Sequence, residues 1–307
     1  MRILLTGGSG FVGQNLKKHL REQGYRVYAI TSSLWDLRRQ ERCESMMDQI
    51  KPDIVVHAAG SVGGIGANQL NPGKFMYENL IMGTNVVHAC MEYKVNKLIM
   101  LGTVCSYPKH TTVPFKEEDM WNGYPEETNA PYGIAKHTVV ELTKHYLTQY
   151  GLNTVNLVPV NMYGPHDNFD LETSHVIPAL IKKIDQASQD GTPVKVWGTG
   201  KASREFLYVK DFCVAVQKAI EYKGVYVEPI NIGTGREITI SQLVSTIKDQ
   251  IGPQVVSQYQ VSRPDGQPRR CLNTTNAREK LGFDATHSLA DGLKETIAWY
   301  KENKETL

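Results

Sequence analysis

Nearly continuous apolar runs alternate with longer amphipathic stretches through the first half of the chain. The apolar runs predict short strands that are covered on both faces, at residues 2–6, 26–30, 53–59, 97–103 and 153–161. The intervening stretches have helical periodicity, at residues 11–23, 40–50, 72–93 and 131–150. Alternation of this kind predicts an α/β fold built on a doubly wound parallel sheet with right-handed crossovers.

The pattern becomes irregular after about residue 165. Helical periodicity returns in four segments: 175–187, 241–252, "TNAREKLGF" and "SLADGLKETIAWYKENK". Two short segments, "VKVWG" and "REFLYV", have the apolar character of strands. The second half therefore predicts strands that return to the sheet, together with a smaller C-terminal lobe.

Composition narrows the class of protein without naming its chemistry. The 307 residues carry a net charge of +2 and no dense basic block, which argues against nucleic-acid binding. No apolar run approaches the ~20 residues that cross a bilayer, and "MRILLTGGSG" lacks the layout of a signal peptide. The cysteines are scattered and have no CxxC spacing, so we expect no disulfide framework, no metal site and a reducing cytoplasm: Cys43, Cys90, Cys105, Cys213 and Cys271.

Three glycines follow the first predicted strand in the segment "RILLTGGSGFVGQNL". Gly7, Gly10 and Gly13 have GxxGxxG spacing and stand directly before a predicted helix. Glycine permits a tight turn and a close approach of the backbone to a pyrophosphate, and the helix N-terminus attracts the phosphate charge. A purely structural turn is the alternative, but the strand–loop–helix context favours dinucleotide binding.

The end of the second predicted strand bears on which dinucleotide is bound. NAD enzymes often have Asp or Glu there to bind the ribose 2′-hydroxyl, whereas this chain has Thr31, Ser32 and Ser33. Small hydroxyl residues, with Arg38 and Arg39 nearby, tolerate a 2′-phosphate, so the sequence favours NADP and leaves NAD open. Alternatively, "WDLRR" only begins the next helix, with Asp36 near the adenine.

A tyrosine and a lysine stand four residues apart in "NAPYGIAKHTVV". Tyr132 and Lys136 share one face of the predicted helix. A neighbouring ammonium favours the phenolate, so Lys136 is expected to lower the pKa of Tyr132 into a range useful for proton transfer. Thr103, at the end of the fourth predicted strand, is placed to bond the same substrate oxygen. Such pairs also arise by chance on ordinary helices.

Several motifs together resemble the extended short-chain dehydrogenase/reductase family. They are "TGGSGFVG", "HAAG", "GTVCSYP", "PYGIAK" and "NMYGP", and they span most of the chain. Five longer segments resemble the GDP-fucose synthase branch of that family, whose members epimerise and reduce a GDP-linked 4-keto-6-deoxy sugar: residues 57–85, 95–109, 163–183, 196–211 and 263–270.

The resemblance implies roles for particular residues. Thr103, Tyr132 and Lys136 match the catalytic triad of the reductase, and Cys105 and His175 match the proton-transfer pair of the epimerase. A 4-keto group acidifies the hydrogens at C3 and C5, and a thiol and an imidazole are suitable partners for exchanging them. From the residues alone, Cys105 could instead be a small buried side chain, and His175 a helix-terminal residue beside Ser174.

The same resemblance implies the binding residues. The cofactor would contact Gly7, Gly10, Phe11, Val12, Gly13, Ser32, Ala58, Ala59, Gly60, Tyr132, Lys136 and Asn161. The diphosphate and base of the substrate would contact Lys183, Trp197, Arg204 and Arg270, although Lys183 could equally lie on a solvated helix face. A Rossmann domain is expected at 1–165, with returning segments near 204–235, and a nucleotide-sugar-binding lobe at 166–203 and 236–307.

Departures from the branch keep other functions open. The glycine loop "GGSG" lacks the basic residue of the branch, Ser32 and Ser33 lack its arginine, and residues 253–262 show little likeness. The alternatives are a reductase without epimerase activity, a 4-epimerase or dehydrogenase acting on another nucleotide sugar such as a GDP-heptose, and a non-catalytic regulator. The family pairs through two helices, which predicts a homodimer through 74–93 and 132–150.

Overall fold

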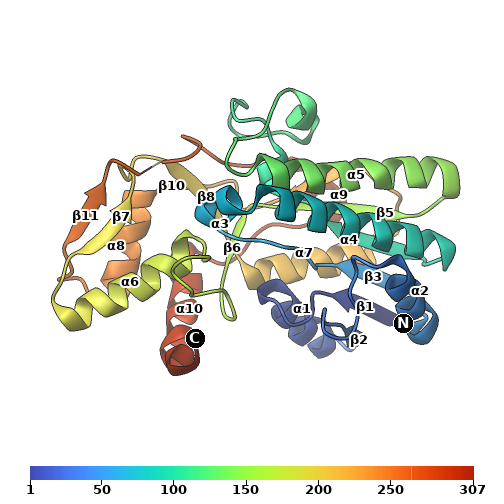
Figure 1. The fold of residues 1–307 in the computed structure, drawn as a ribbon, viewed down its shortest axis with the longest axis horizontal. Coiled ribbons are helices and arrows are strands. Elements are labelled where there is room, and N and C mark those ends of the chain that lie inside the picture. Colours follow the sequence, from blue (N-terminus) through green and yellow to red (C-terminus); the bar gives the residue numbers. More distant parts are fainter. Residues whose placement is uncertain (264) are drawn as a thin grey trace.

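A six-stranded parallel sheet forms the centre of the computed structural model, which describes residues 1–263 and 265–307 (Figure 1). The strands lie in the order β2-β1-β3-β4-β5-β9, and every neighbouring pair is parallel. Their bounds are β1 Arg2–Thr6, β2 Arg26–Ala29, β3 Ile54–His57, β4 Lys97–Leu101, β5 Thr154–Pro159 and β9 Pro229–Ile232. The predicted doubly wound parallel sheet is confirmed.

Side chains of each strand alternate between two separate cores, one on each face of the sheet. In β1, Ile3 and Leu5 belong to the core beneath one layer of helices, whereas Leu4 belongs to the core beneath the other. All three are fully buried. This two-sided burial explains why the strands read as continuous apolar runs.

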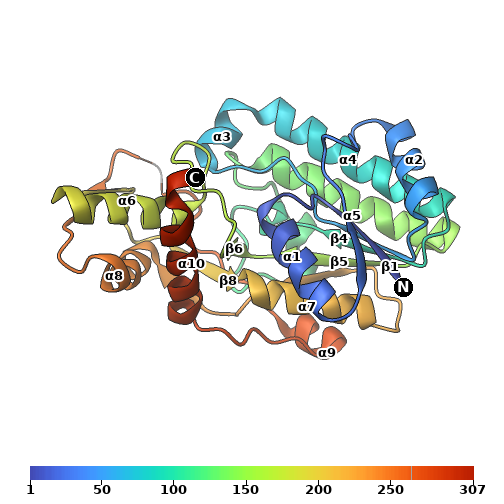
Figure 2. The same ribbon diagram turned by 90° about the horizontal axis from the view of Figure 1, so that it is seen from below.

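Helices cover both faces of the sheet (Figure 2). On one face lie α1 Phe11–Glu22 and α7 Val209–Glu221; on the other lie α2 Gln40–Ile50, α4 Pro72–Glu92 and α5 Ala130–Tyr150. Among the described residues, none of the helices combines the length and apolar character that spanning a bilayer requires. The chain steps outward from β1 to β2 and then returns to β3, so a topological switch lies between β1 and β3. Ligands of doubly wound sheets bind at such a point.

The later part of the chain forms a C-terminal lobe at one end of the sheet (Figures 1 and 2). Its helices are α6 Val176–Asp190, α8 Ile240–Ile251 and α10 Leu289–Asn303, which share one apolar core. Two small sheets accompany them, with strand orders β10-β8-β6 and β11-β7. The strands are β6 Asn161–Tyr163, β7 Val194–Trp197, β8 Ser203–Tyr208, β10 Glu237–Thr239 and β11 Ser257–Gln260.

The remaining elements are short. They are α3 Ile65–Leu70, α9 Thr275–Leu281 and the 3₁₀ turns η1 Val104–Ser106, η2 Glu117–Trp121 and η3 Lys304–Thr306. The run predicted as one strand at 153–161 divides at Val160, because β5 belongs to the large sheet and β6 to a small one. Residue 264, inside the motif 263–270, lies outside the described residues.

Candidate active site

The loop after β1 brings backbone unusually close to backbone. Gly7 has a φ of 69°, and a Cβ there would lie 2.8 Å from the backbone of Ala59. A Cβ on Gly13 would lie 2.0 Å from the carbonyl oxygen of Gly7, which also accepts a hydrogen bond of 3.0 Å from the amide of Gly10. Only glycine fits this packing. Gly10 precedes the first turn of α1, where no side chain caps the amides, so the loop fits the phosphates of a dinucleotide.

The segment after β3 forms the facing wall. The amide of Ala59 donates to Thr6 Oγ1 over 3.1 Å, and the same hydroxyl lies 2.9 Å from His57 Nδ1. Burial lowers the pKa of His57 to about 3, helped by the positive charge of Lys136. His57 is therefore a neutral residue that fixes Thr6 and the start of Ala58–Gly60. His57 begins the motif "HAAG", but the sequence alone predicts no role for it.

A 3₁₀ turn after β4 positions Thr103 and Cys105. Thr103 caps η1, and its Oγ1 accepts a hydrogen bond of 3.2 Å from the amide of Cys105. Helix α5 packs directly on this turn, since Ser106 Oγ donates to the carbonyl of Gly133 over 3.0 Å and a Cβ on Gly133 would lie 2.1 Å from the carbonyl oxygen of Cys105. The fold thus brings Tyr132, in the first turn of α5, to Thr103.

The electrostatics of the Tyr132 phenol differ from the sequence expectation. Burial raises the pKa of Tyr132 well above its ordinary value, and the charge of Cys105 raises it further. A hydrogen bond with Thr103 lowers this pKa, but by less than the other two effects raise it. Burial also lowers the pKa of Lys136 to about 8. The expectation that Lys136 lowers the pKa of Tyr132 is wrong for the protein alone, because burial disfavours the phenolate and raises that pKa.

Arg270 joins the far end of the chain to Cys105. Its Nη1 lies 3.8 Å from Cys105 Sγ, and its Nε donates to Gln267 Oε1 over 3.1 Å. Gln267 is itself fixed, because its Nε2 donates to the carbonyl of Lys109 over 2.9 Å. Arg270 is buried. The structure therefore places a fixed positive charge beside the thiol, and sequence reasoning, which assigned Arg270 to substrate binding, gave no sign of this contact.

The positive charge of Arg270 also acts on His175 and Arg204. His175 immediately precedes α6 and is exposed. The surrounding protein lowers the pKa of His175, and so does the charge of Arg270. Burial, followed by the charge of Arg270, lowers the pKa of Arg204 to about 10. Arg204 also donates from Nη2 to the carbonyl of Asp265 over 3.0 Å.

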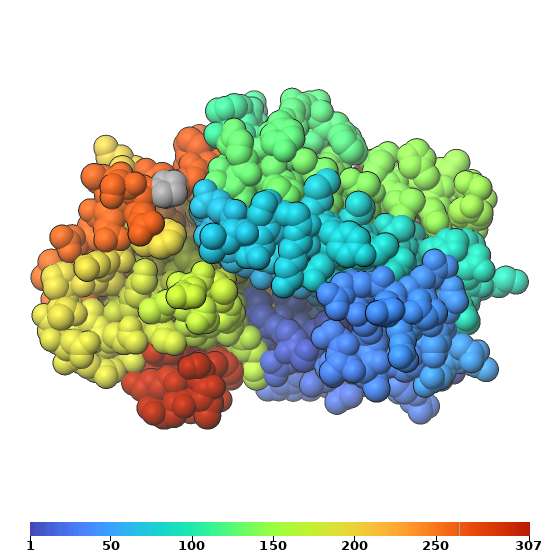
Figure 3. Space-filling model, in the orientation of Figure 1, coloured from blue at the N-terminus to red at the C-terminus, as the bar shows by residue number. Residues whose placement is uncertain are grey.

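The loop before His175 touches the sheet domain. The amide of Gly64 donates to the carbonyl of Thr173 over 3.0 Å, and a Cβ on Gly64 would lie 2.7 Å from the carbonyl oxygen of Ser174. Figure 3 shows a recess between the yellow-green residues near the start of α6 and the dark-blue residues of the N-terminus. The start of α6 and the N-terminal part of the chain thus border this recess.

The other expected substrate residues form a separate group. Trp197 of β7, which is 46% exposed, has Lys183 Nζ 5.7 Å and the Arg263 guanidinium 5.1 Å from its ring centroid. Arg263 was not predicted to take part. Asn161, which was expected to contact the cofactor, lies in β6 and donates weakly to the carbonyl of Glu205 over 3.5 Å. Lys183, Trp197 and Arg263 thus belong to the C-terminal lobe and not to the turn that carries Thr103.

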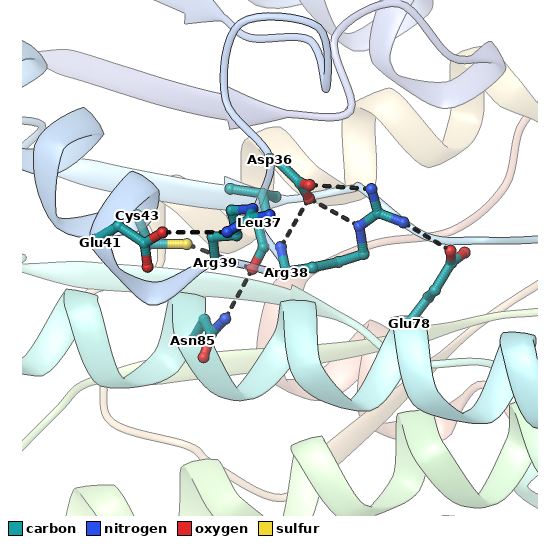
Figure 4. Close-up of polar contacts among 8 residues, drawn as sticks. All are labelled: Asp36, Leu37, Arg38, Arg39, Glu41, Cys43, Glu78 and Asn85. Atoms are coloured by element: carbon teal, nitrogen blue, oxygen red, sulfur yellow. Dashed lines mark hydrogen bonds and ion pairs between the residues drawn. The ribbon is translucent and has the colours of Figure 1, made fainter.

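The arginines after β2 are engaged in ion pairs (Figure 4). Arg38 donates from Nε to Asp36 Oδ1 over 2.9 Å and from Nη1 to Glu78 Oε1 over 3.0 Å. Arg39 Nη1 lies 3.8 Å from Glu41 Oε1. Arg38 is thus shared by two carboxylates, whereas the pair of Arg39 with Glu41 is longer and exposed. The expected contact of Arg38 and Arg39 with a 2′-phosphate stays a prediction. Ser32 is exposed in the same loop.

A family model settles the class of protein. The model described as "NAD dependent epimerase/dehydratase family" matches residues 3–233, which include the glycine loop and the Thr103–Tyr132 site. The chain belongs to this family. Its members in the extended short-chain dehydrogenase/reductase group include nucleotide-sugar epimerases and reductases, and the chain is an enzyme of this type.

Individual relatives of the family cover nearly the whole chain. GDP-L-fucose synthase 1 of Arabidopsis thaliana is 38% identical over 305 residues, which are 98% of this chain and 94% of the relative. A GDP-6-OMe-4-keto-L-xylo-heptose reductase from C. jejuni has a similar structure, with a TM-score of 0.93 at 27% identity and 98% coverage of both chains. A GDP-L-fucose synthetase from Naegleria fowleri bound to NADP gives a TM-score of 0.89 at 28% identity, covering 99% of this chain and 95% of that one.

Proposed function

We propose that the protein is an NADPH-dependent reductase with 3,5-epimerase activity, acting on a GDP-linked 4-keto-6-deoxyhexose or a closely related 4-keto sugar. The observation that carries this proposal is the turn that presents Thr103 and Cys105 together, packed on the first turn of α5 with Tyr132 and Lys136. Relatives that make GDP-fucose support the choice of sugar.

The reduction needs a proton donor at the carbonyl oxygen. The raised pKa keeps Tyr132 protonated at neutral pH, which suits an acid that gives its proton to the 4-oxygen. Thr103 donates a hydrogen bond to the same oxygen and so positions the sugar carbonyl beside Tyr132. Bound NADPH supplies the hydride that arrives at C4. Lys136, whose pKa is near 8, holds the ribose hydroxyls and favours the phenolate that proton donation leaves behind.

The epimerisation needs two groups on opposite faces of the sugar. Cys105 Sγ removes the proton from C3 or C5, and the protonated form of His175 delivers a proton to the other face; the lowered pKa of His175 makes that form a stronger acid. The Arg270 guanidinium beside Cys105 Sγ stabilises negative charge that forms there. His175 comes from the C-terminal lobe and Cys105 from the sheet domain, which supports their placement on opposite sides of a substrate held in between.

The nucleotide part of the substrate is assigned to the C-terminal lobe, residues 166–203 and 236–307. Arg204 and Arg270 bind the diphosphate, since guanidinium forks match phosphate oxygens. Trp197 offers an exposed indole face for the guanine, and Lys183 lies over the same ring. The sheet domain, residues 1–165 with the returning segments near 204–235, holds the cofactor through the glycine loop, Ala58–Gly60 and Asn161.

The division of roles predicts separable chemistry. When the protein acts on GDP-4-keto-6-deoxymannose with NADPH in heavy water, we expect deuterium at both C3 and C5 of the product, measured by mass spectrometry and NMR. Cys105→Ser is expected to abolish this exchange while it still reduces a sugar that has already been epimerised. Cys213→Ser, which alters a buried thiol of α7, is the matched control and should exchange normally.

One alternative has its own support. The structural likeness to a GDP-linked 4-keto-heptose reductase favours a reductase that acts on a heptose without epimerisation. In that case the wild-type protein would oxidise NADPH in heavy water with no deuterium at C3 or C5, and Cys105→Ser would leave turnover unchanged.

The assembly proposed from the family is a homodimer through α4 and α5. These helices pack together along their length (Figure 1), and Met76, Tyr77 and Tyr150 keep exposed apolar or aromatic surface on them. Sedimentation at micromolar concentration is expected to show twice the 34.4 kDa mass of the chain. A single species at the monomer mass would remove this assignment and leave the chemistry untouched.

A further inference from the structure

A cavity of about 390 Å³ lies against the glycine loop and has no part in the site described above. The loop contributes Gly8 and Ser9, and the end of β2 contributes Ala29 and Thr31. Helix α1 contributes Lys17 and Arg21. The cavity thus lies where the first glycine turn meets the end of the second strand, the place that receives the adenosine ribose of a dinucleotide in this fold.

The charge of this cavity is positive. Lys17 and Arg21 are one helical turn apart on the same face of α1, and Asp and Glu are absent from its lining. Within residues 1–263 and 265–307, no carboxylate forms an ion pair with either side chain. Helical side chains lean toward the helix N-terminus, which directs Lys17 toward Ser9. Arg21 donates from Nη2 to the carbonyl of Val27 over 3.1 Å and is thereby held beside β2.

The neighbouring loop has the opposite character. Arg38 is shared by two carboxylates, Asp36 and Glu78, so this trio carries a net charge of −1 (Figure 4). A phosphate dianion placed on the trio would be repelled rather than bound. The positive charge close to the ribose position that no carboxylate shares therefore comes from α1 and not from Arg38.

We infer that Lys17 and Arg21 bind the 2′-phosphate of NADP(H), with the hydroxyls of Ser9 and Thr31 as further donors, and so select NADP(H) over NAD(H). This inference rests on the proposed dinucleotide-binding function. Two cations and two hydroxyls suit a phosphomonoester dianion, because charge-assisted hydrogen bonds to phosphate are stronger than neutral ones. Lys17 and Arg21 would thus supply the positive charge that the glycine loop "GGSG" lacks, since Ser9 is uncharged.

The test compares nucleotides that differ only in the 2′-phosphate. Isothermal titration calorimetry on the full chain, without substrate, is run with 2′,5′-ADP, 5′-AMP and inorganic phosphate, and again with NADPH and NADH. We expect the wild-type protein to bind 2′,5′-ADP roughly 30-fold or more tightly than 5′-AMP, as two charged hydrogen bonds imply. Inorganic phosphate should bind far more weakly than 2′,5′-ADP, since it lacks the adenosine.

Variants of α1 test whether Lys17 and Arg21 cause the preference for a 2′-phosphate. Lys17→Ala/Arg21→Ala should bind 2′,5′-ADP and 5′-AMP about equally and keep the wild-type affinity for NADH. Lys17→Ala alone should lose much of the preference without disturbing the bond of Arg21 to β2. Lys18→Ala is the matched control, because Lys18 is exposed on the same helix and does not line the cavity; it should behave as wild type.

The possible failures are distinguishable. A wild-type protein that binds NADH and NADPH equally, or a double variant that keeps the full preference for NADPH, would overturn this inference and leave dinucleotide binding intact. A wild-type protein that binds neither dinucleotide would overturn the proposed function together with this inference.

Discussion

Tyr132→Phe is expected to lower kcat for reduction of the 4-keto sugar by a factor of roughly 10²–10⁴, the usual contribution of a positioned proton donor. The substitution removes only the phenolic oxygen. Because burial keeps the pKa of this phenol high, the wild-type residue carries the proton that the reduced oxygen requires, and Phe has none to give. The rate is measured as the loss of nicotinamide absorbance under saturating substrate and NADPH.

Two comparisons assign the loss to chemistry. Tyr132→Phe should bind NADPH with near wild-type affinity by calorimetry, since Lys136 and the glycine loop are unchanged. Thr103→Ser keeps a hydroxyl at the N-cap of η1 and should retain most of the rate. If Tyr132→Phe turned over at the wild-type rate, another group would have to supply the proton, and the proposed role of Tyr132 would be abandoned.

Gly13→Ala is expected to reduce the affinity for NADPH by roughly 100-fold or more, because the third glycine sets the distance between helix and strand in this motif. The added Cβ would meet the carbonyl oxygen of Gly7 at 2.0 Å. Both partners are backbone, so the loop or α1 must shift, and the phosphate cradle shifts with it. Calorimetric titration with NADPH measures the loss, and a lower melting temperature should accompany it.

Gly73→Ala is the matched control for this substitution. Gly73 lies in α4, and a Cβ there would meet nothing within 4 Å, so binding and melting should stay close to wild type. Wild-type affinity in Gly13→Ala would mean that the glycine loop does not hold the cofactor in the way proposed.

The sequence predicted the sheet domain well because its signals are local. Strand β1 with the glycines, and the Tyr132–Lys136 pair on α5, each depend on spacing within one or two turns of chain. The alternation of apolar runs and helical stretches then requires a parallel sheet. Strand β9 was not singled out, since a four-residue segment, Pro229–Ile232, carries too little periodicity to stand apart.

The features that the sequence could not predict join distant parts of the chain. The contact of Arg270 with Cys105 spans 165 positions, and the bond of Arg38 with Glu78 spans 40. No spacing rule signals either contact. The expected lowering of the pKa of Tyr132 failed for a related reason: it counted the neighbouring ammonium and omitted the burial that the packing of α5 on η1 imposes.

The most direct test of the central proposal follows the hydride itself. The protein is incubated with GDP-4-keto-6-deoxymannose and NADPH that carries deuterium at the transferable position, and the product sugar is analysed by NMR. The account predicts that the deuterium appears at C4 of the sugar with the wild-type protein, and that Tyr132→Phe slows this transfer severely. Oxidation of NADPH without deuterium at C4, or no consumption of either compound by the wild-type protein, would contradict it.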